Sequence, residues 1–268
     1  MSFKLGFCAL HWRQPDLERA LPALAEAGWD GWECRLPIEW MGPVSRMRRL
    51  CDDAGMPVAV VGAQGSPDTR DWEHVELNKR RMEYAAELGA DCFLFMNGRK
   101  PDGAAATEDD IRAAADGADE WADYAGQFDL ELTYHIHTNL LVDSIDEWRL
   151  YMSCLQKAKL CIDVSHAELW DYDPVQSIVD FYSQLNYVHL QDYSSCTVRE
   201  PGNYNPVWVD VGAAECLDFK GVLDTLVDKG FNRWVTACPQ APPEGGTEAS
   251  QSARDSASMR QYIRGLGY

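Results

Sequence analysis

Five of the six histidines in this chain lie at or just after the end of a β-rich run of sequence. They are His11, His135, His137, His166 and His189. A single histidine at a strand end is often only a core residue. Five of them indicate a shared site, because imidazoles that face one opening need a metal, an anion or a substrate as partner.

Three successive motifs carry the residues with the strongest metal-binding character. The run YHIHTN places His135 and His137 on the same side of one strand, since side chains alternate along a strand. The run CIDVSH brings Asp163 to the end of the next strand, and YVHLQD brings His189 and Gln191 to the one after. Two imidazoles and a carboxylate form a donor set for one divalent ion, of which Mn, Zn, Co, Fe and Mg are the candidates. We therefore expect His135, Asp163 and His189 to be metal ligands.

Asp163 and His137 each have a second interpretation. An aspartate often caps the first turn of a helix, but the following helix is predicted to begin near Asp173, too far along the chain for Asp163 to cap it. His137 could orient another ligand instead of binding the ion itself. The sequence favours Asp163 as a ligand and His137 as a residue beside the ligand set.

The elements that must position these residues alternate between strand and helix from end to end. Helical sequence follows each predicted strand, with the first helix expected over residues 15–27 and the last over 252–263. Alternation of this kind implies a parallel sheet, and eight units favour an α/β fold of the (β/α)8 TIM-barrel type. A doubly wound open sheet fits less well, because no glycine-rich phosphate fingerprint follows the first strand. We expect a single domain over residues 1–268. The predicted strands are 3–11, 29–35, 57–62, 91–96, 130–137, 160–164, 186–191 and 234–238.

Composition narrows the class of partner. The chain has 268 residues and a formal net charge of −19, which disfavours binding to a nucleic-acid backbone. Its nine cysteines form no CxxC pair, so neither a disulfide framework nor a zinc knuckle is indicated. The first residues do not read as a signal peptide, and no apolar run is long enough for a membrane span. We expect a cytoplasmic protein without a membrane partner, and the sequence leaves open whether it forms a homo-oligomer.

Taken together, these motifs resemble the sugar phosphate isomerase/epimerase group of xylose isomerase-like TIM barrels. That group includes inosose dehydratase, ketose 3-epimerases and endonuclease IV. The resemblance covers nearly the whole chain and implies a barrel, a divalent metal and a small sugar or cyclitol substrate. The motifs that carry it are AGWDGWECR, YHIHTN, CIDVSH, YVHLQDYS and DVGAAECLDFKGVLDTLVDKGF.

The ligand set departs from the family pattern, which is Glu, Asp, His and Glu on strands five to eight. The resemblance implies Asp163 and His189 directly, whereas His135 stands where the first Glu is expected and Cys238 where the second is. A Cys238 thiolate would shift the metal preference towards Zn or Fe. Alternatively Cys238 is only a small residue and water fills that position. Gln191 replaces a lysine that is common in the family.

Without the two Glu residues, the pair that moves a proton beside a carbonyl in family epimerases is missing. His137 and His166 titrate near neutral pH and are the predicted catalytic replacements. Glu33 matches a family position that faces the substrate and is a third catalytic candidate. A surface carboxylate before a loop is the other interpretation of Glu33.

Aromatic and amide side chains are the candidates for contact with the substrate. Trp12, with Trp40 and Trp208, could supply walls on which a sugar ring stacks, and Gln191 could supply a polar contact. Because the chain has ten tryptophans, most of them must belong to the core.

Three functions follow from these residues. The first is a divalent-metal-dependent enzyme that acts on a sugar, keto-sugar or cyclitol by proton transfer next to a carbonyl. Isomerisation, epimerisation and dehydration by β-elimination all fit, and the missing Glu pair favours a lyase or dehydratase. The second is a non-catalytic or divergent barrel subunit that binds a sugar. The third, an endonuclease IV-like DNA repair enzyme, is disfavoured by the net charge of −19.

Overall fold

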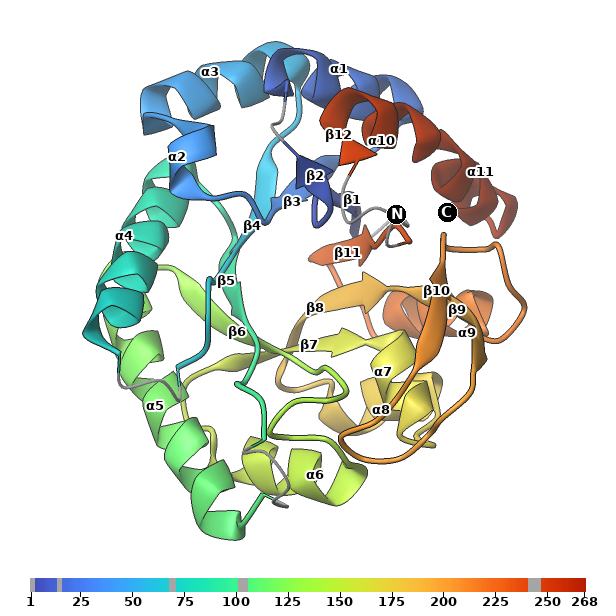
Figure 1. Cartoon of the computed structure of the whole chain (residues 1–268). Coiled ribbons are helices and arrows are strands. Elements are labelled where there is room, and N and C mark those ends of the chain that lie inside the picture. The colour runs from blue at the N-terminus through green and yellow to red at the C-terminus, as the bar shows by residue number, and fades with distance from the viewer. Residues whose placement is uncertain (1–2, 14–15, 68–70, 101–105, 241–246) are drawn as a thin grey trace.

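Eight parallel strands close into a barrel in the computed structural model of the chain (Figure 1). Each strand pairs with its neighbour, and β1 pairs with both β3 and β11 to close the ring. The predicted (β/α)8 TIM barrel is confirmed, and each predicted strand overlaps one of these eight. The barrel strands are β1 (Lys4–Cys8), β3 (Gly31–Cys34), β4 (Val58–Gly62), β5 (Cys92–Phe95), β6 (Glu131–His135), β7 (Lys159–Asp163), β8 (Leu185–Leu190) and β11 (Trp234–Ala237). The structure describes residues 3–13, 16–67, 71–100, 106–240 and 247–268.

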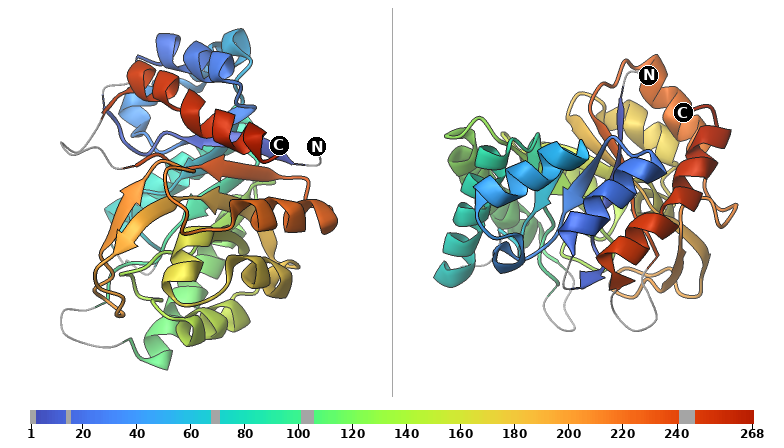
Figure 2. Two further views of the ribbon diagram at one scale, coloured as in Figure 1. Left: turned by 90° about the vertical axis from the view of Figure 1, so that its right-hand side faces the viewer. Right: turned by 90° about the horizontal axis from the view of Figure 1, so that it is seen from above.

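Helices surround the barrel on its outside, as the three views in Figures 1 and 2 show. None of the helices in the described ranges is long and apolar enough to cross a membrane. The helices are α1 (Leu17–Ala27), α2 (Ile38–Met41), α3 (Val44–Ala54), α4 (Trp72–Leu88), α5 (Glu108–Gly126), α6 (Ile145–Cys154), α7 (Val164–Leu169), α8 (Pro174–Phe181), α9 (Phe219–Asp228), α10 (Ala249–Asp255) and α11 (Ala257–Gly265).

Local sequence accounts for the ends of these helices. Helix α1 buries Leu17, Leu21 and Leu24 on one face and ends at Gly28, whose φ of 92° is accessible to glycine at little cost. The predicted start of this helix at Pro15 lies outside the described residues. The last predicted helix, over 252–263, is in fact two helices, α10 and α11.

Two small sheets were not predicted. Strands β9 (Asp192–Cys196) and β10 (Pro206–Val209) form an antiparallel hairpin directly after β8, and β2 (Trp12–Arg13) pairs with β12 (Thr247–Glu248). Both lie in loops that follow the carboxyl ends of barrel strands. Their runs are too short, or too polar, for hydrophobic alternation to reveal them.

The barrel interior is filled by side chains below the carboxyl ends of the strands. Cys161, Tyr187 and Trp234 belong to this buried cluster. Since strand side chains alternate, Cys161 and Tyr187 share their faces with Asp163 and His189, two residues further on. The apolar cluster is therefore the floor of whatever site the strand ends form.

Candidate functional site

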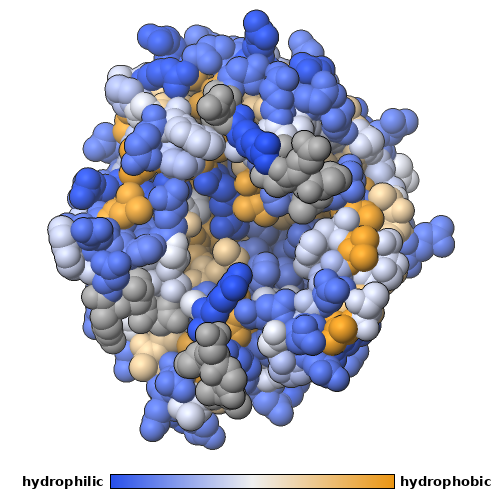
Figure 3. Space-filling model, in the orientation of Figure 1, coloured by the Kyte–Doolittle hydropathy of each residue, from blue (hydrophilic) through white to orange (hydrophobic). Residues whose placement is uncertain are grey.

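Three of the predicted ligands meet at the carboxyl ends of adjacent strands. His135 and Asp163 are the last residues of β6 and β7, and Asp163 lies opposite His189 in the pairing of β7 with β8. All three are buried. Asp163 Oδ2 lies 3.4 Å from His135 Nε2 and 3.8 Å from His189 Nδ1. On the face that carries these strand ends, the space-filling view is hollowed near its centre (Figure 3).

Asp163 uses its two oxygens differently. Its Oδ1 accepts hydrogen bonds from the backbone N–H of Ser165 at 3.0 Å and from the Ser165 hydroxyl at 2.6 Å, so Asp163 is the N-cap of α7. The expectation that no helix begins close enough to be capped was wrong, because the six-residue α7 precedes the predicted one. Capping fixes the carboxylate and leaves Oδ2 facing the two histidines.

Glu33, at the third residue of β3, is fully buried, so the interpretation as a surface carboxylate is wrong. Its Oε2 accepts hydrogen bonds from His189 Nε2 at 2.6 Å and from the Tyr187 hydroxyl at 2.9 Å. Its Oε1 is bonded to Arg35 and accepts from Cys8 Sγ at 3.3 Å. Both oxygens are thus engaged by protein groups, which is the arrangement of a carboxylate that orients a histidine.

The two buried carboxylates of this cluster favour a positive charge on His189 itself. Burial raises the pKa of Glu33, but Arg35 and His189 outweigh it and hold this pKa well below its usual range. Burial also raises the pKa of Asp163, and His166, His135 and His189 lower it well below its usual range. For His189 burial lowers the pKa, yet the two carboxylates raise it to about 10.

His137 and His166 form a second pair, with ring centroids 4.0 Å apart. His137 Nδ1 lies 2.6 Å from the carbonyl oxygen of Thr138, so Nδ1 carries the proton and Nε2 the lone pair in the neutral ring. His166 has the opposite tautomer, because its Nδ1 accepts from the Thr138 N–H at 3.2 Å and Nε2 therefore carries the proton. Among the described residues, none hydrogen-bonds His166 Nε2.

Burial lowers the pKa of both rings, so both are neutral at pH 7. His137 is half-buried, whereas His166 is fully buried. Trp208 of the β9–β10 hairpin packs against His166, with ring centroids 5.2 Å apart. The structure therefore brings Trp208, one of the predicted aromatic walls, to this pair.

Two cysteines lie against the same histidines. Cys238, the residue after β11, has its Sγ 3.5 Å from His189 Nδ1. A hydrogen bond with Cys8 and burial raise the pKa of Cys238 well above its usual range. Cys161 was not predicted, although ligand atoms of His135, Cys161 and His189 all lie within 4.8 Å of one another. Its position two residues before Asp163 on one strand is the signal that could have identified it.

The remaining candidates lie apart from the histidines or make no described contact with them. Trp12 is buried and stacks on Trp32, with ring centroids 5.7 Å apart. Trp40 on α2 is 42% exposed. Gln191 is half-buried between β8 and β9. His11 lines a separate cavity of about 120 Å³ that it shares with other side chains. The roles of Trp12 and Gln191 in substrate binding stay predictions.

Two separations between donor atoms are those of a divalent-ion site. A tetrahedral site with bonds of about 2.1–2.3 Å has its ligand atoms roughly 3.4–3.8 Å apart. The separations of Asp163 Oδ2 from His135 Nε2 and His189 Nδ1, 3.4 and 3.8 Å, fall in that range. Glu33 holds a proton on His189 Nε2, so an ion that displaces the other proton of this ring would bind Nδ1, which faces Asp163.

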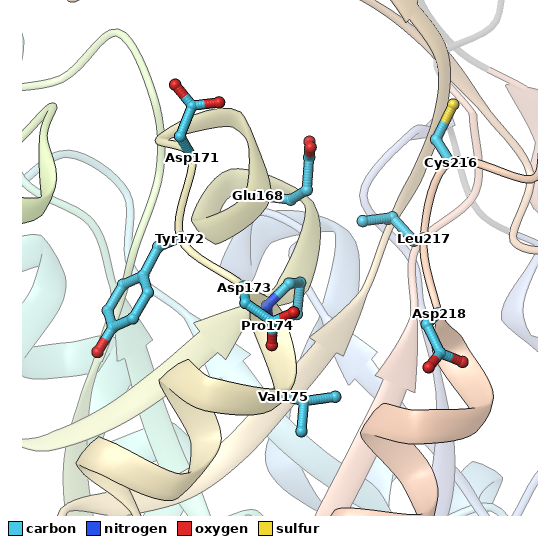
Figure 4. Close-up of a pocket in the computed structure, with 9 residues that line it drawn as sticks. All are labelled: Glu168, Asp171, Tyr172, Asp173, Pro174, Val175, Cys216, Leu217 and Asp218. Carbon is cyan, nitrogen blue, oxygen red and sulfur yellow. The ribbon is translucent and has the colours of Figure 1, made fainter.

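An acidic pocket of about 420 Å³ lies beside α8 and α9 (Figure 4). Its carboxylates have structural partners: Asp173 and Asp218 cap α8 and α9, and Arg199 bridges Glu168 and Asp171. These contacts explain the acidic residues without a ligand.

Comparison with known proteins identifies relatives across nearly the whole chain. The sequence model of a family described as "Xylose isomerase-like TIM barrel" matches residues 21–262. Inosose dehydratase from Geobacillus kaustophilus is 21% identical, in an alignment that covers 90% of this chain and 88% of that protein.

Solved structures give the same fold at low identity. The 3-keto-D-glucoside 4-epimerase from E. coli has a TM-score of 0.73 and 16% identity, and the alignment covers 97% of this chain and 99% of that one. The D-allulose 3-epimerase from Methylomonas sp. in complex with D-allulose has a TM-score of 0.76 and 17% identity, with 100% of this chain and 98% of that one covered.

Proposed function

Because the chain belongs to the xylose isomerase-like TIM barrel family, we propose that it is a divalent-metal-dependent enzyme acting on a keto-sugar or cyclitol. The reaction is a proton transfer next to a carbonyl, and dehydration or isomerisation fits better than epimerisation. The observation that carries this proposal is the pair of neutral imidazoles, His137 and His166, with opposite tautomers beside three buried donor residues. The names of the relatives, which are sugar epimerases and an inosose dehydratase, support the substrate class.

His135, Asp163 and His189 would hold the ion. When bound, the ion supplies Lewis-acid polarisation of a substrate carbonyl. Glu33 would keep Nδ1 of His189 directed at the proposed ion, and the capping of α7 keeps Asp163 in place. The hydrogen bond from His189 to Glu33 and the cap formed by Asp163 exist before any substrate binds, so the donor set is organised in advance.

His137 is the base in this proposal. Its Nε2 carries the lone pair and the residue is half-buried, so Nε2 can receive a proton from the carbon beside the carbonyl. His166 keeps its proton on Nε2 and donates a hydrogen bond to a substrate oxygen, as a neutral imidazole can. A buried donor without a protein partner costs free energy, which an acceptor oxygen would recover.

The placement of the two rings bears on the reaction type. Inversion at a carbon requires groups on opposite faces of that carbon, whereas these rings lie 4.0 Å apart. A base on one side can return its proton to a neighbouring carbon or to a departing hydroxyl. Isomerisation and loss of water are therefore the reactions we favour for this chain.

Metal analysis combined with hydrogen exchange tests the proposal. We expect one divalent ion per chain at neutral pH, lost in His189→Ala. We also expect deuterium uptake from D2O, or formation of an enone, with inosose or D-allulose as the first compounds tried. A chain without stoichiometric metal contradicts the proposal. Retained metal without exchange or elimination on any keto-sugar favours a non-catalytic sugar-binding barrel.

A further inference from the structure

We propose that Cys238 supplies a thiolate ligand to the metal centre, so that the site takes Zn²⁺, Co²⁺ or Fe²⁺ in preference to Mg²⁺ or Mn²⁺. The inference rests on the proposed metal centre and narrows it to one ligand and one class of ion. Thiolate is a soft donor that selects against the hard ions, which prefer oxygen ligands.

Geometry places the sulfur beside one of the proposed donor atoms. Cys238 Sγ is 3.5 Å from His189 Nδ1, the ring nitrogen that is not bonded to Glu33. This separation falls in the range of about 3.4–3.8 Å that ligand atoms of a tetrahedral site show. The backbone N–H of Cys238 donates to the carbonyl of Leu190 at 2.8 Å, so the residue is held beside β8 before any ion binds.

A bound divalent ion would change the charge balance of the buried cluster in favour of a thiolate. Glu33 and Asp163 are fully buried carboxylates, and the Arg35 guanidinium is paired with Glu33. If neutral imidazoles bound a divalent ion there, the ion, the two carboxylates and the guanidinium would together carry one net positive charge in a buried place. One thiolate removes that charge, and an uncompensated buried charge is costly.

Two other thiols are close, and each has a reason not to be the ligand. Cys8 Sγ donates to Glu33 Oε1 at 3.3 Å, so it bonds the carboxylate that orients His189 and not the ligand atom Nδ1. Cys161 lies within 4.8 Å of the two histidines, but it belongs to the apolar floor with Tyr187. Cys8 and Cys161 therefore provide matched controls for the loss of one buried sulfur.

Cobalt spectroscopy on the full chain tests the inference. Metal-free protein loaded with Co²⁺ should show visible bands from the bound ion and a near-ultraviolet band from sulfur-to-cobalt charge transfer. We expect Cys238→Ser to lose the charge-transfer band and keep the visible bands, while Cys8→Ser and Cys161→Ser keep both. Circular dichroism melting of each variant shows whether it is folded.

The outcomes separate this inference from the function on which it rests. Visible bands without a charge-transfer band in the wild-type chain overturn the Cys238 assignment and leave the metal centre standing. Loss of the band in Cys161→Ser and not in Cys238→Ser also overturns it. Failure to bind Co²⁺ at all counts against both. X-ray absorption of the Zn²⁺-loaded wild type, which needs no variant, should show one sulfur neighbour at about 2.3 Å.

Discussion

At the scale of single residues, the site depends on which atom of each side chain faces which partner. His189 bonds Glu33 through Nε2 and faces Asp163 and Cys238 through Nδ1. His137 and His166 bond the two backbone groups of Thr138 and acquire opposite tautomers. These orientations, rather than the residue types alone, assign the proposed ligand, base and donor roles.

Glu33 provides the first prediction at this scale. In Glu33→Gln the charge that fixes the proton on His189 Nε2 is lost, so Zn²⁺ affinity should fall by about 10–100-fold, as for other groups that orient a ligand. A competing chromogenic chelator measures it. Tyr187→Phe, which removes the hydroxyl bonded to Glu33 and Thr236 and keeps the carboxylate, is the control and should change the affinity less. Equal affinity in Glu33→Gln and the wild type would show that Glu33 does not position His189.

His137 provides the second prediction. His137→Gln should slow deuterium exchange at the carbon beside the carbonyl by about 10²–10⁴-fold, the usual contribution of a general base. Proton NMR in D2O measures the rate, and metal content should be unchanged. His74→Gln, at a half-exposed histidine on α4, is the matched control and should exchange like the wild type. Exchange at the wild-type rate in His137→Gln would remove it as the base.

At the scale of elements, short additions after the barrel strands shape the site. Helix α7 begins directly after Asp163, so one residue ends a strand, caps a helix and faces the proposed ion. The β9–β10 hairpin follows β8 and brings Trp208 against His166. The barrel strands set the positions of the site residues. The additions orient Asp163 and cover His166.

Close packing between strands yields a prediction for Gly31 of β3. A β-carbon there would lie 2.5 Å from the Trp234 ring and 2.7 Å from the Pro57 carbonyl oxygen. Gly31→Ala should therefore lower the free energy of unfolding by about 1–3 kcal/mol, as overpacking does. Gly126→Ala, where no atom lies within 4 Å, should be neutral or stabilising. Urea unfolding measures both, and equal stability of the two variants would contradict the packing argument.

At the scale of the whole molecule, a strongly acidic chain surrounds a small buried cluster of balanced charge. The net charge of −19 belongs to the chain as a whole, whereas the fully buried carboxylates at the site, Glu33 and Asp163, face Arg35 and the histidines. The chain as a whole therefore repels anions at long range, while the buried carboxylates stabilise a cation at the site. Small neutral substrates are compatible with both.

The net charge predicts how the chain responds to DNA. Because a protein must neutralise phosphates to bind a duplex, we expect no retardation of a duplex with an abasic site at about 0.15 M salt. A gel-shift assay tests this, with a nuclease assay on the same duplex. A salt-sensitive shift, or cleavage at the abasic site, would restore the endonuclease interpretation.

The sequence by itself determined the barrel and the strand ends. Alternation of strand and helix predicts eight units, and the period of two along YHIH and YVHLQ places His135 and His189 on inward faces. Both are local patterns, and they need only the general rule that parallel strands end on one side of a barrel.

Only the tertiary structure decided the burial of Glu33, the cap formed by Asp163, the tautomers of His137 and His166 and the nearness of Cys161. Glu33 and His189 are 156 residues apart, and their hydrogen bond depends on the register of the closed barrel and on side-chain rotation. No local pattern encodes those quantities. The prediction of one polar site was available from spacing, while the chemistry assigned to each atom required the packed fold.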